Sequence, residues 1–220
     1  MKGAIVLIAM VVVFCALPVN GALITIKIEA VVDDVVEAGD YLNGQIKVGD
    51  LITGTYTYDT DTPDSSPLPG VGRYEHYGYP SGFSLSVGGL HFMTDPTDTY
   101  FEMFVVDNNA GVDGYSVTSY INLPLSDGTS VSNIKWSLQD TSELALSSTN
   151  LATTAPVLDD WPTNFLQFGA GSGGGRGSAG GPAIGFGVMG HVSSAVVIPE
   201  PATILLLGLA GIALIRKGRK

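Results

Sequence analysis

Two short apolar runs, one at each end of the chain, limit what these 220 residues can fold into. They cover residues 4–17 and 202–215. A helix of either length rises about 21 Å at about 1.5 Å per residue, whereas the hydrocarbon core of a bilayer is roughly 30 Å thick. Each run can therefore form one short apolar helix, whereas the long segment between the runs must fold around a hydrophobic core of its own.

The charge is divided in the same way. Residues 22–198 hold 5 basic and 20 acidic residues, and the whole chain has a net charge of −11. This negative excess excludes a nucleic-acid binder that works through a basic patch. The single cysteine, Cys15, lies inside the first apolar run, which excludes a disulfide scaffold and a cysteine-based zinc site. The middle of the chain must be stabilised by packing alone.

The N-terminal run has the features of a secretory signal peptide. Lys2 precedes it, Pro18 ends it, and the small residues Gly21 and Ala22 follow. We therefore expect residues 1–21 to form a signal helix that is cleaved after Gly21 or Ala22. An uncleaved anchor or a core strand is the alternative interpretation.

The C-terminal apolar run lies between a Pro-Glu-Pro sequence and a cluster of basic residues. Pro199-Glu200-Pro201 precedes it, and Pro201 is suited to the first turn of a helix. The basic cluster that closes the chain consists of Arg216, Lys217, Arg219 and Lys220. Basic side chains extend the reach of a short helix and stay on the cytoplasmic side. We expect a C-terminal transmembrane helix that holds the middle of the chain outside the cytoplasm.

This C-terminal arrangement resembles the PEP-CTERM sorting signal of Gram-negative bacteria, a segment that some domain catalogues label an ice-binding protein C-terminal domain. The resemblance covers residues 199–220. It implies recognition by an exosortase, a membrane cysteine protease that cleaves near the motif, in bacteria that often make exopolysaccharide. The implied path is anchoring at the inner membrane, processing, and transfer to the cell envelope or the extracellular space. A plain membrane anchor with a chance Pro-Glu-Pro is the alternative.

The middle of the chain, residues 22–198, shows period-two alternation between Gly, Pro, Asn and Asp turns. It predicts strands near residues 24–29, 51–58, 83–87, 90–93, 100–106, 115–121, 134–138, 165–168 and 184–197. The expected fold is all-β, an antiparallel β-sandwich of jelly-roll character. The glycine-rich segment 169–181 is expected to be a loop inside this extracytoplasmic domain. Alternatively, the domain ends near Phe168 and the rest is a stalk.

Tyrosines gather in residues 73–79, which we expect to form a loop. Tyr74, Tyr77 and Tyr79 are candidate carbohydrate contacts, because an exposed Tyr ring offers an apolar face with a polar tip. The alternative is that these rings cover the edge of the sandwich.

Three aspartates between residues 59 and 64 are a candidate calcium site. Asp59, Asp61 and Asp64 offer the oxygen ligands that Ca²⁺ prefers, although the full EF-hand pattern is absent. A solvated turn capped by Asp side chains is the favoured alternative. No other cofactor is expected.

No catalytic constellation is evident. The chain has three histidines and no Gly-x-Ser-x-Gly elbow. We therefore expect a non-enzymatic surface or matrix protein, structural or interactive with exopolysaccharide. A carbohydrate-binding module and a secreted glycoside hydrolase, whose carboxylates would come from distant strands, remain the alternatives.

Overall fold

The computed structural model describes residues 23–170 and 185–199, and these residues form ten strands and one short 3-10 turn. The elements are β1 (Leu23–Glu37), β2 (Leu51–Asp59), β3 (Val71–His76), β4 (Gly82–Val87), β5 (Leu90–Met93), β6 (Phe101–Asn109), β7 (Val112–Ser119), β8 (Asn133–Asp140), η1 (Leu158–Asp160), β9 (Thr163–Gly169) and β10 (Phe186–Ile198). The all-β prediction is confirmed.

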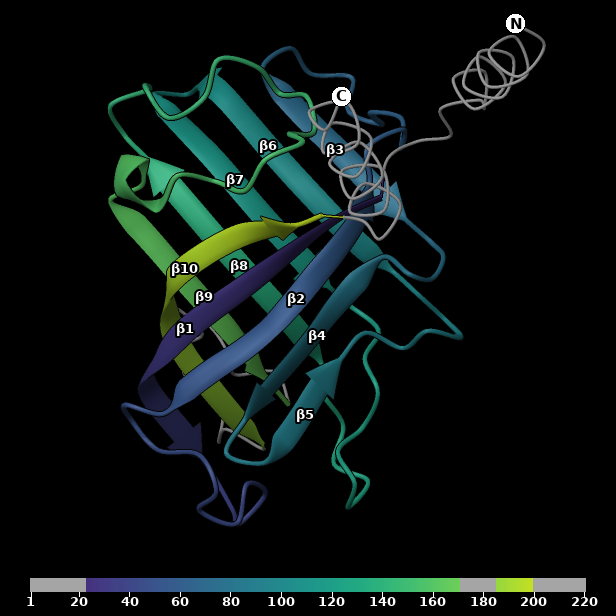
Figure 1. Ribbon diagram of the computed structural model, residues 1–220, viewed down its shortest axis with the longest axis vertical. Helices are drawn as coiled ribbons and strands as arrows, with labels where there is room; N and C mark the ends of the chain where they lie inside the picture. Colours follow the sequence, from purple (N-terminus) through teal and green to yellow (C-terminus); the bar gives the residue numbers. More distant parts are fainter. Residues whose placement is uncertain (1–22, 171–184, 200–220) are drawn as a thin grey trace, which may run out of the picture.

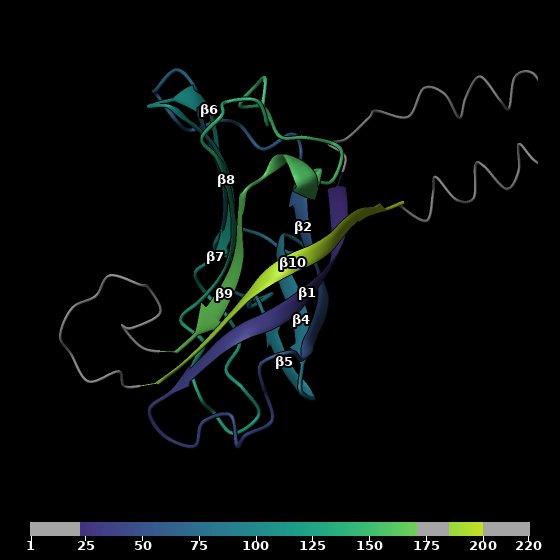
Figure 2. The same cartoon turned by 90° about the vertical axis from the view of Figure 1, so that its left-hand side faces the viewer.

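All ten strands belong to one antiparallel sheet with the order β3-β6-β7-β8-β9-β10-β1-β2-β4-β5. The sheet is curled, so that β6, β7 and β8 face β1, β2, β4 and β5 across the interior (Figures 1 and 2). The chain after residue 185 returns to this sheet, because β10 pairs with both β9 and β1.

The predicted sandwich of two separate jelly-roll sheets is not confirmed. The long strands β1 and β10 carry the backbone pairing from one half of the sheet to the other. Register shifts after Glu29 and after Val32 each place an extra residue in one of these two strands, and such bulges bend a strand and increase its twist. A continuous bent sheet therefore replaces the expected break between two sheets.

Glycine permits close backbone approach at this bend. A Cβ atom on Gly190 would lie 2.3 Å from the carbonyl oxygen of Val31, and one on Gly169 would lie 2.3 Å from that of Phe186. Neither position accepts a larger residue without a shift of the neighbouring backbone.

Large aromatic side chains fill the interior between the two halves. Trp136 is fully buried and contacts Tyr56 and Tyr115 edge-on, with ring centroids 5.7 and 6.0 Å apart. The hydroxyl oxygens of these two tyrosines lie 2.9 Å apart, and the Trp136 Nε1–H donates to Asn164 Oδ1 at 3.0 Å. Burial raises the pKa of both tyrosines, so they remain protonated and hydrogen-bonded.

Three sequence predictions lie wholly or mostly outside the described residues: the signal helix, the C-terminal transmembrane helix and the glycine-rich loop 169–181, of which only residues 169 and 170 are described. Within residues 23–170 and 185–199, no helix has the length and apolar character needed to span a membrane.

Two aspartates on neighbouring strands hold the long connection that follows β8. Asp113 and Asp140 lie opposite each other on β7 and β8, and both are buried. Asp113 accepts the backbone N–H groups of Asn108 and Leu146, each at 2.8 Å. Asp140 accepts those of Leu144 and Ser142, together with the Ser142 hydroxyl.

These contacts predict a loss of stability in acid. The N–H groups of Leu144 and Ser142 lower the pKa of Asp140 below its ordinary value of 3.8. A group with a lowered folded-state pKa stabilises the fold above its unfolded pKa, and that stabilisation is lost as the pH falls through the folded value. Urea unfolding at a series of pH values should therefore show the midpoint falling below about pH 4, and Asp140→Asn should flatten that fall. An equally steep fall in Asp140→Asn would contradict the role of this carboxylate.

Candidate functional site

Strand β3 directs its side chains alternately to the core and to solvent. Tyr74 and His76 are buried, whereas Arg73 and Glu75 lie on the outer face. The prediction that residues 73–79 form a loop is therefore wrong for its first half. β3 forms because its whole length pairs with β6, from Val71 opposite Val106 to His76 opposite Phe101.

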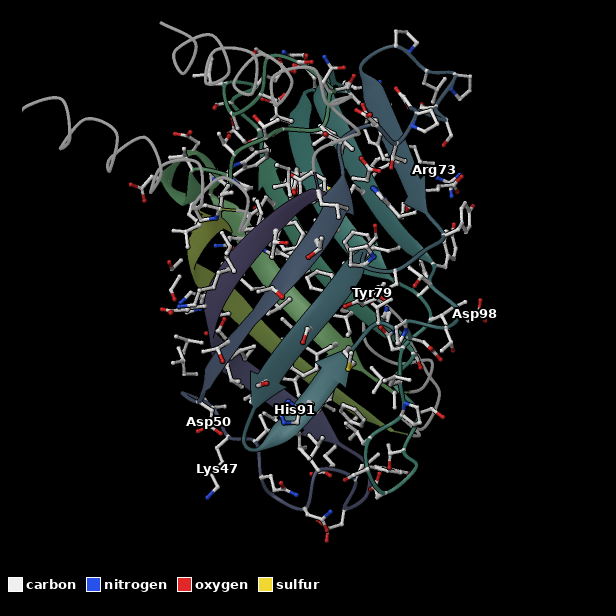
Figure 3. All side chains as sticks on the ribbon, turned by 45° about the vertical axis from the view of Figure 1, so that its right-hand side comes forward. Lys47, Asp50, Arg73, Tyr79, His91 and Asp98 are labelled. Atoms are coloured by element: carbon white, nitrogen blue, oxygen red, sulfur yellow. The ribbon has the colours of Figure 1, made fainter. Side chains whose placement is uncertain are left out.

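A guanidinium joins two carboxylates on this outer face. Glu75 and Glu102 lie directly opposite each other on β3 and β6. The Arg73 Nε–H donates to Glu102 at 2.6 Å, and Arg73 Nη2 lies 3.0 Å from Glu75. The hydrogen bond and charge of Glu102 raise the pKa of Arg73, which stays charged. The positive charge of Arg73 thus offsets the repulsion between the carboxylates of Glu75 and Glu102 (Figure 3 labels Arg73).

Three tyrosine rings form a parallel stack beside these charges. Tyr77 stacks on Tyr100 with ring centroids 5.4 Å apart and planes 7° apart. Tyr100 stacks in turn on Tyr120 at 4.9 Å and 25°. The outer rings of the stack are the exposed ones, because Tyr77 is 68% and Tyr120 44% exposed while Tyr100 is half-buried. We call Tyr77, Tyr100 and Tyr120 the tyrosine stack.

Hydrogen bonds tie the stack to the carboxylates. The Tyr100 hydroxyl donates to Glu75 at 3.3 Å, and the Tyr120 hydroxyl donates to Glu102 at 3.2 Å. Burial, followed by the charge of Glu102, raises the pKa of both hydroxyls. These groups therefore remain donors at neutral pH, and the surface combines flat apolar rings with fixed polar groups.

The three tyrosines predicted to contact carbohydrate are not brought together. Tyr74 lies in the core, where its hydroxyl donates to the carbonyl of Thr149 at 2.9 Å. Tyr77 belongs to the tyrosine stack. Tyr79 is 75% exposed and lies in the connection between β3 and β4 (labelled in Figure 3). Tyr100 and Tyr120 were missed because they are 20 residues apart in sequence and meet only through the pairing of the Tyr120 N–H with the Tyr100 carbonyl.

Two of the three aspartates of the candidate calcium site, Asp59 and Asp64, accept backbone hydrogen bonds in local turns. Asp59 Oδ1 accepts the backbone N–H of Asp61 at 2.9 Å. Asp64 Oδ1 accepts the N–H groups of Ser66 and Arg73 at 2.8 and 2.9 Å. In the part of the chain that the structure describes, no group of three or more acidic, histidine or cysteine side chains is placed to hold a metal ion. The geometry corresponds to capped Asx turns.

The first residues of β1 and the last residues of β10 lie side by side in the sheet. β1 begins at Leu23 and β10 ends at Ile198, which lies opposite Thr25 in the antiparallel pair (Figure 1). Pro199, the first residue of the Pro-Glu-Pro motif, is exposed. Glu200, Pro201 and the basic cluster of Arg216, Lys217, Arg219 and Lys220 lie outside the described residues.

Comparison with known proteins identifies this C-terminal segment. Residues 197–220 match the family model of the PEP-CTERM protein-sorting motif. Neither a curated protein nor a solved structure matches the chain. The motif implies export and recognition by exosortase, a membrane protease. The chain is therefore a protein that carries a C-terminal PEP-CTERM sorting motif.

Proposed function

We propose that this protein is a non-enzymatic component of the cell surface or extracellular matrix that associates with exopolysaccharide. Its C-terminal segment holds it at the inner membrane until an exosortase acts, and the β domain then moves to the envelope or the extracellular space. The tyrosine stack and the exposed Tyr79 form the contact surface.

The observation that carries this proposal is that the tyrosine stack lies beside the ion-paired side chains of Arg73, Glu75 and Glu102. Aromatic rings present apolar faces suited to the C–H face of a sugar ring, and their polar tips keep them compatible with water. The outer rings, Tyr77 and Tyr120, are well exposed. Arg73, Glu75 and Glu102 surround them with hydrogen-bonding groups that could bind sugar hydroxyls.

The same contacts favour binding over hydrolysis. A glycoside hydrolase needs one protonated and one ionised carboxyl group on opposite sides of the scissile bond. Glu75 and Glu102 lie on one face and share Arg73 as a partner. We therefore propose no catalytic residue.

Affinity electrophoresis through gels containing exopolysaccharide from the producing bacterium tests this proposal. We expect the double variant Tyr77→Ala/Tyr79→Ala to bind about tenfold more weakly than the unaltered protein, a change of ~1.4 kcal/mol. Leu144→Ala serves as the control, because Leu144 is 84% exposed and lies outside the tyrosine surface. Retention that is the same in all three proteins, or absent from the unaltered one, would contradict the proposal.

A further inference from the structure

The last residues of β10 have a strand partner on one edge only. β1 pairs with β10 as far as Ile198, whereas β9 pairs with it only from Gly187 to Gly190. On the β9 side, the Asn164 side chain also binds the backbone of Val192. Its amide N–H donates to the Val192 carbonyl at 2.7 Å, and its Oδ1 accepts the Val192 N–H at 3.3 Å. Beyond this point, no backbone hydrogen bond from another described segment reaches that edge. The turn η1 lies beside β10, and there the Asp160 N–H donates to the Val157 carbonyl and the Trp161 N–H to the Leu158 carbonyl.

The register shows which backbone groups are left on this edge. The Val32 N–H donates to the Asp50 carbonyl, just beyond the last β1–β2 pair, Val31 with Leu51. Backbone groups point alternately to the two sides of a strand. Along the regular β1–β2 pairing, the backbone N–H and C=O groups of even-numbered β1 residues therefore point to β2. Those of odd-numbered residues point to β10.

Val196 lies opposite Lys27, an odd-numbered residue of β1. The backbone groups of Val196 are thus directed to β1. Those of its neighbours Ala195 and Val197 are directed to the other edge, which presents two N–H donors and two carbonyl acceptors. We call residues 195–198 the open edge.

The open edge carries neither of the two side-chain features, charge and proline, that protect such edges. Natural sheets shield exposed edges with charged residues, proline or a covering segment. Residues 193–198 read Ser-Ser-Ala-Val-Val-Ile, with neither charge nor proline. The outermost strand β3, in contrast, is covered, because the Ser65 N–H donates to the Arg73 carbonyl and Asp64 accepts the Arg73 N–H. The outermost strand at the other end of the sheet, β5, has only four residues.

We propose that the exosortase that recognises the sorting motif also adds a strand to the open edge. The motif match begins at residue 197, inside β10, so no linker separates the folded sheet from the segment that the protease reads. A partner bound at the start of that segment is next to the end of β10. Strand addition to a free edge provides backbone hydrogen bonds with little dependence on side chains.

Processing of the full-length chain in cells that contain the exosortase tests this proposal. Ala195→Pro removes an N–H from the open edge and leaves the bonds to β1 in place, a position that tolerates proline in edge strands. Residue 195 also lies outside the matched motif. We expect the ratio of processed to unprocessed chain, measured by intact mass, to fall about three- to tenfold, the factor for one lost hydrogen bond. Val48→Pro, in an exposed part of the β1–β2 connection, controls for a general effect of proline on export.

A second variant separates edge recognition from motif recognition. Inserting eight glycine and serine residues between Ile198 and Pro199 keeps residues 199–220 intact but moves them away from the open edge. The proposal expects slower processing of this variant, whereas a protease that reads the motif alone should process it at the same rate or faster. Limited proteolysis of each full-length variant checks that the sheet has formed. The proposal is overturned if both folded variants are processed like the unaltered chain, including the case where the open edge is found to pair two copies of this chain.

Discussion

Trp136→Ala is expected to destabilise the β domain by about 3–5 kcal/mol, the usual cost of replacing a fully buried tryptophan by alanine. Trp136 contributes ring contacts with Tyr56 and Tyr115 from the centre of β8. Its loss also leaves Asn164 Oδ1 without the indole N–H, and Asn164 holds Val192 of β10. Since small domains are stable by only about 5–15 kcal/mol, a large part of the total stability is removed.

Urea unfolding, followed by tyrosine and tryptophan fluorescence, measures this effect. Leu144→Ala removes a side chain that is 84% exposed and should change the free energy of unfolding by less than about 0.5 kcal/mol. A midpoint for Trp136→Ala that matches that of Leu144→Ala would contradict the position of Trp136 at the centre of the core.

Replacing the basic cluster at the C-terminus by serine is expected to abolish retention at the membrane. Arg216, Lys217, Arg219 and Lys220 follow an apolar run that is short for a bilayer. Positive charges on the cytoplasmic side stop such a run from passing through. Without them, we expect the full-length chain to be recovered unprocessed from the extracytoplasmic soluble fraction, because the protease acts in the membrane.

Cell fractionation with an antibody against the β domain gives the measurement. A control replaces Lys47 and Lys135, which lie in the acidic middle of the chain, by serine. Only the C-terminal variant should leave the membrane fraction. Equal retention of the two variants would show that the basic cluster does not act as the stop signal.

Most strands could be predicted because their alternation is local. Ile24, Ile26 and Ile28 alternate with polar residues, and the first of these is half-buried and the other two fully buried in β1. The pair Gly88-Gly89 adopts the positive φ angles of 58° and 83° that a tight turn between β4 and β5 requires. Such patterns depend on neighbouring residues, so they are visible in the sequence.

The arrangement of the strands could not be predicted in the same way. β3 also alternates, with Arg73 and Glu75 outside and Tyr74 inside, but glycines on both sides give it the composition of a loop. Its pairing with β6 decides its structure. Likewise, one curled sheet rather than two results from the pairing of β1 with β10, whose paired residues are 149 to 173 positions apart. No local pattern encodes a contact over that separation.

The candidate site shows the same division between local and distant contacts. Tyr77 and Tyr79 were found because they lie in one short segment, and Tyr74 was assigned with them for the same reason. Strand alternation sends Tyr74 to the opposite side of the sheet. Of the remaining rings of the tyrosine stack, Tyr100 immediately precedes β6 and Tyr120 immediately follows β7, so their selection requires the β6–β7 register.

The pairing of the first strand with the last has a consequence for the order of events during export. If the predicted signal peptide starts export at the N-terminus, β1 crosses the membrane early, but its neighbour β10 crosses only when nearly all of the domain has passed. Contacts between such distant residues form late and slowly. One edge of β1 must therefore remain vacant throughout passage, and a chaperone that shields this edge would suppress aggregation. The sheet is completed beside the bilayer, at the moment when only the sorting segment is still to be released.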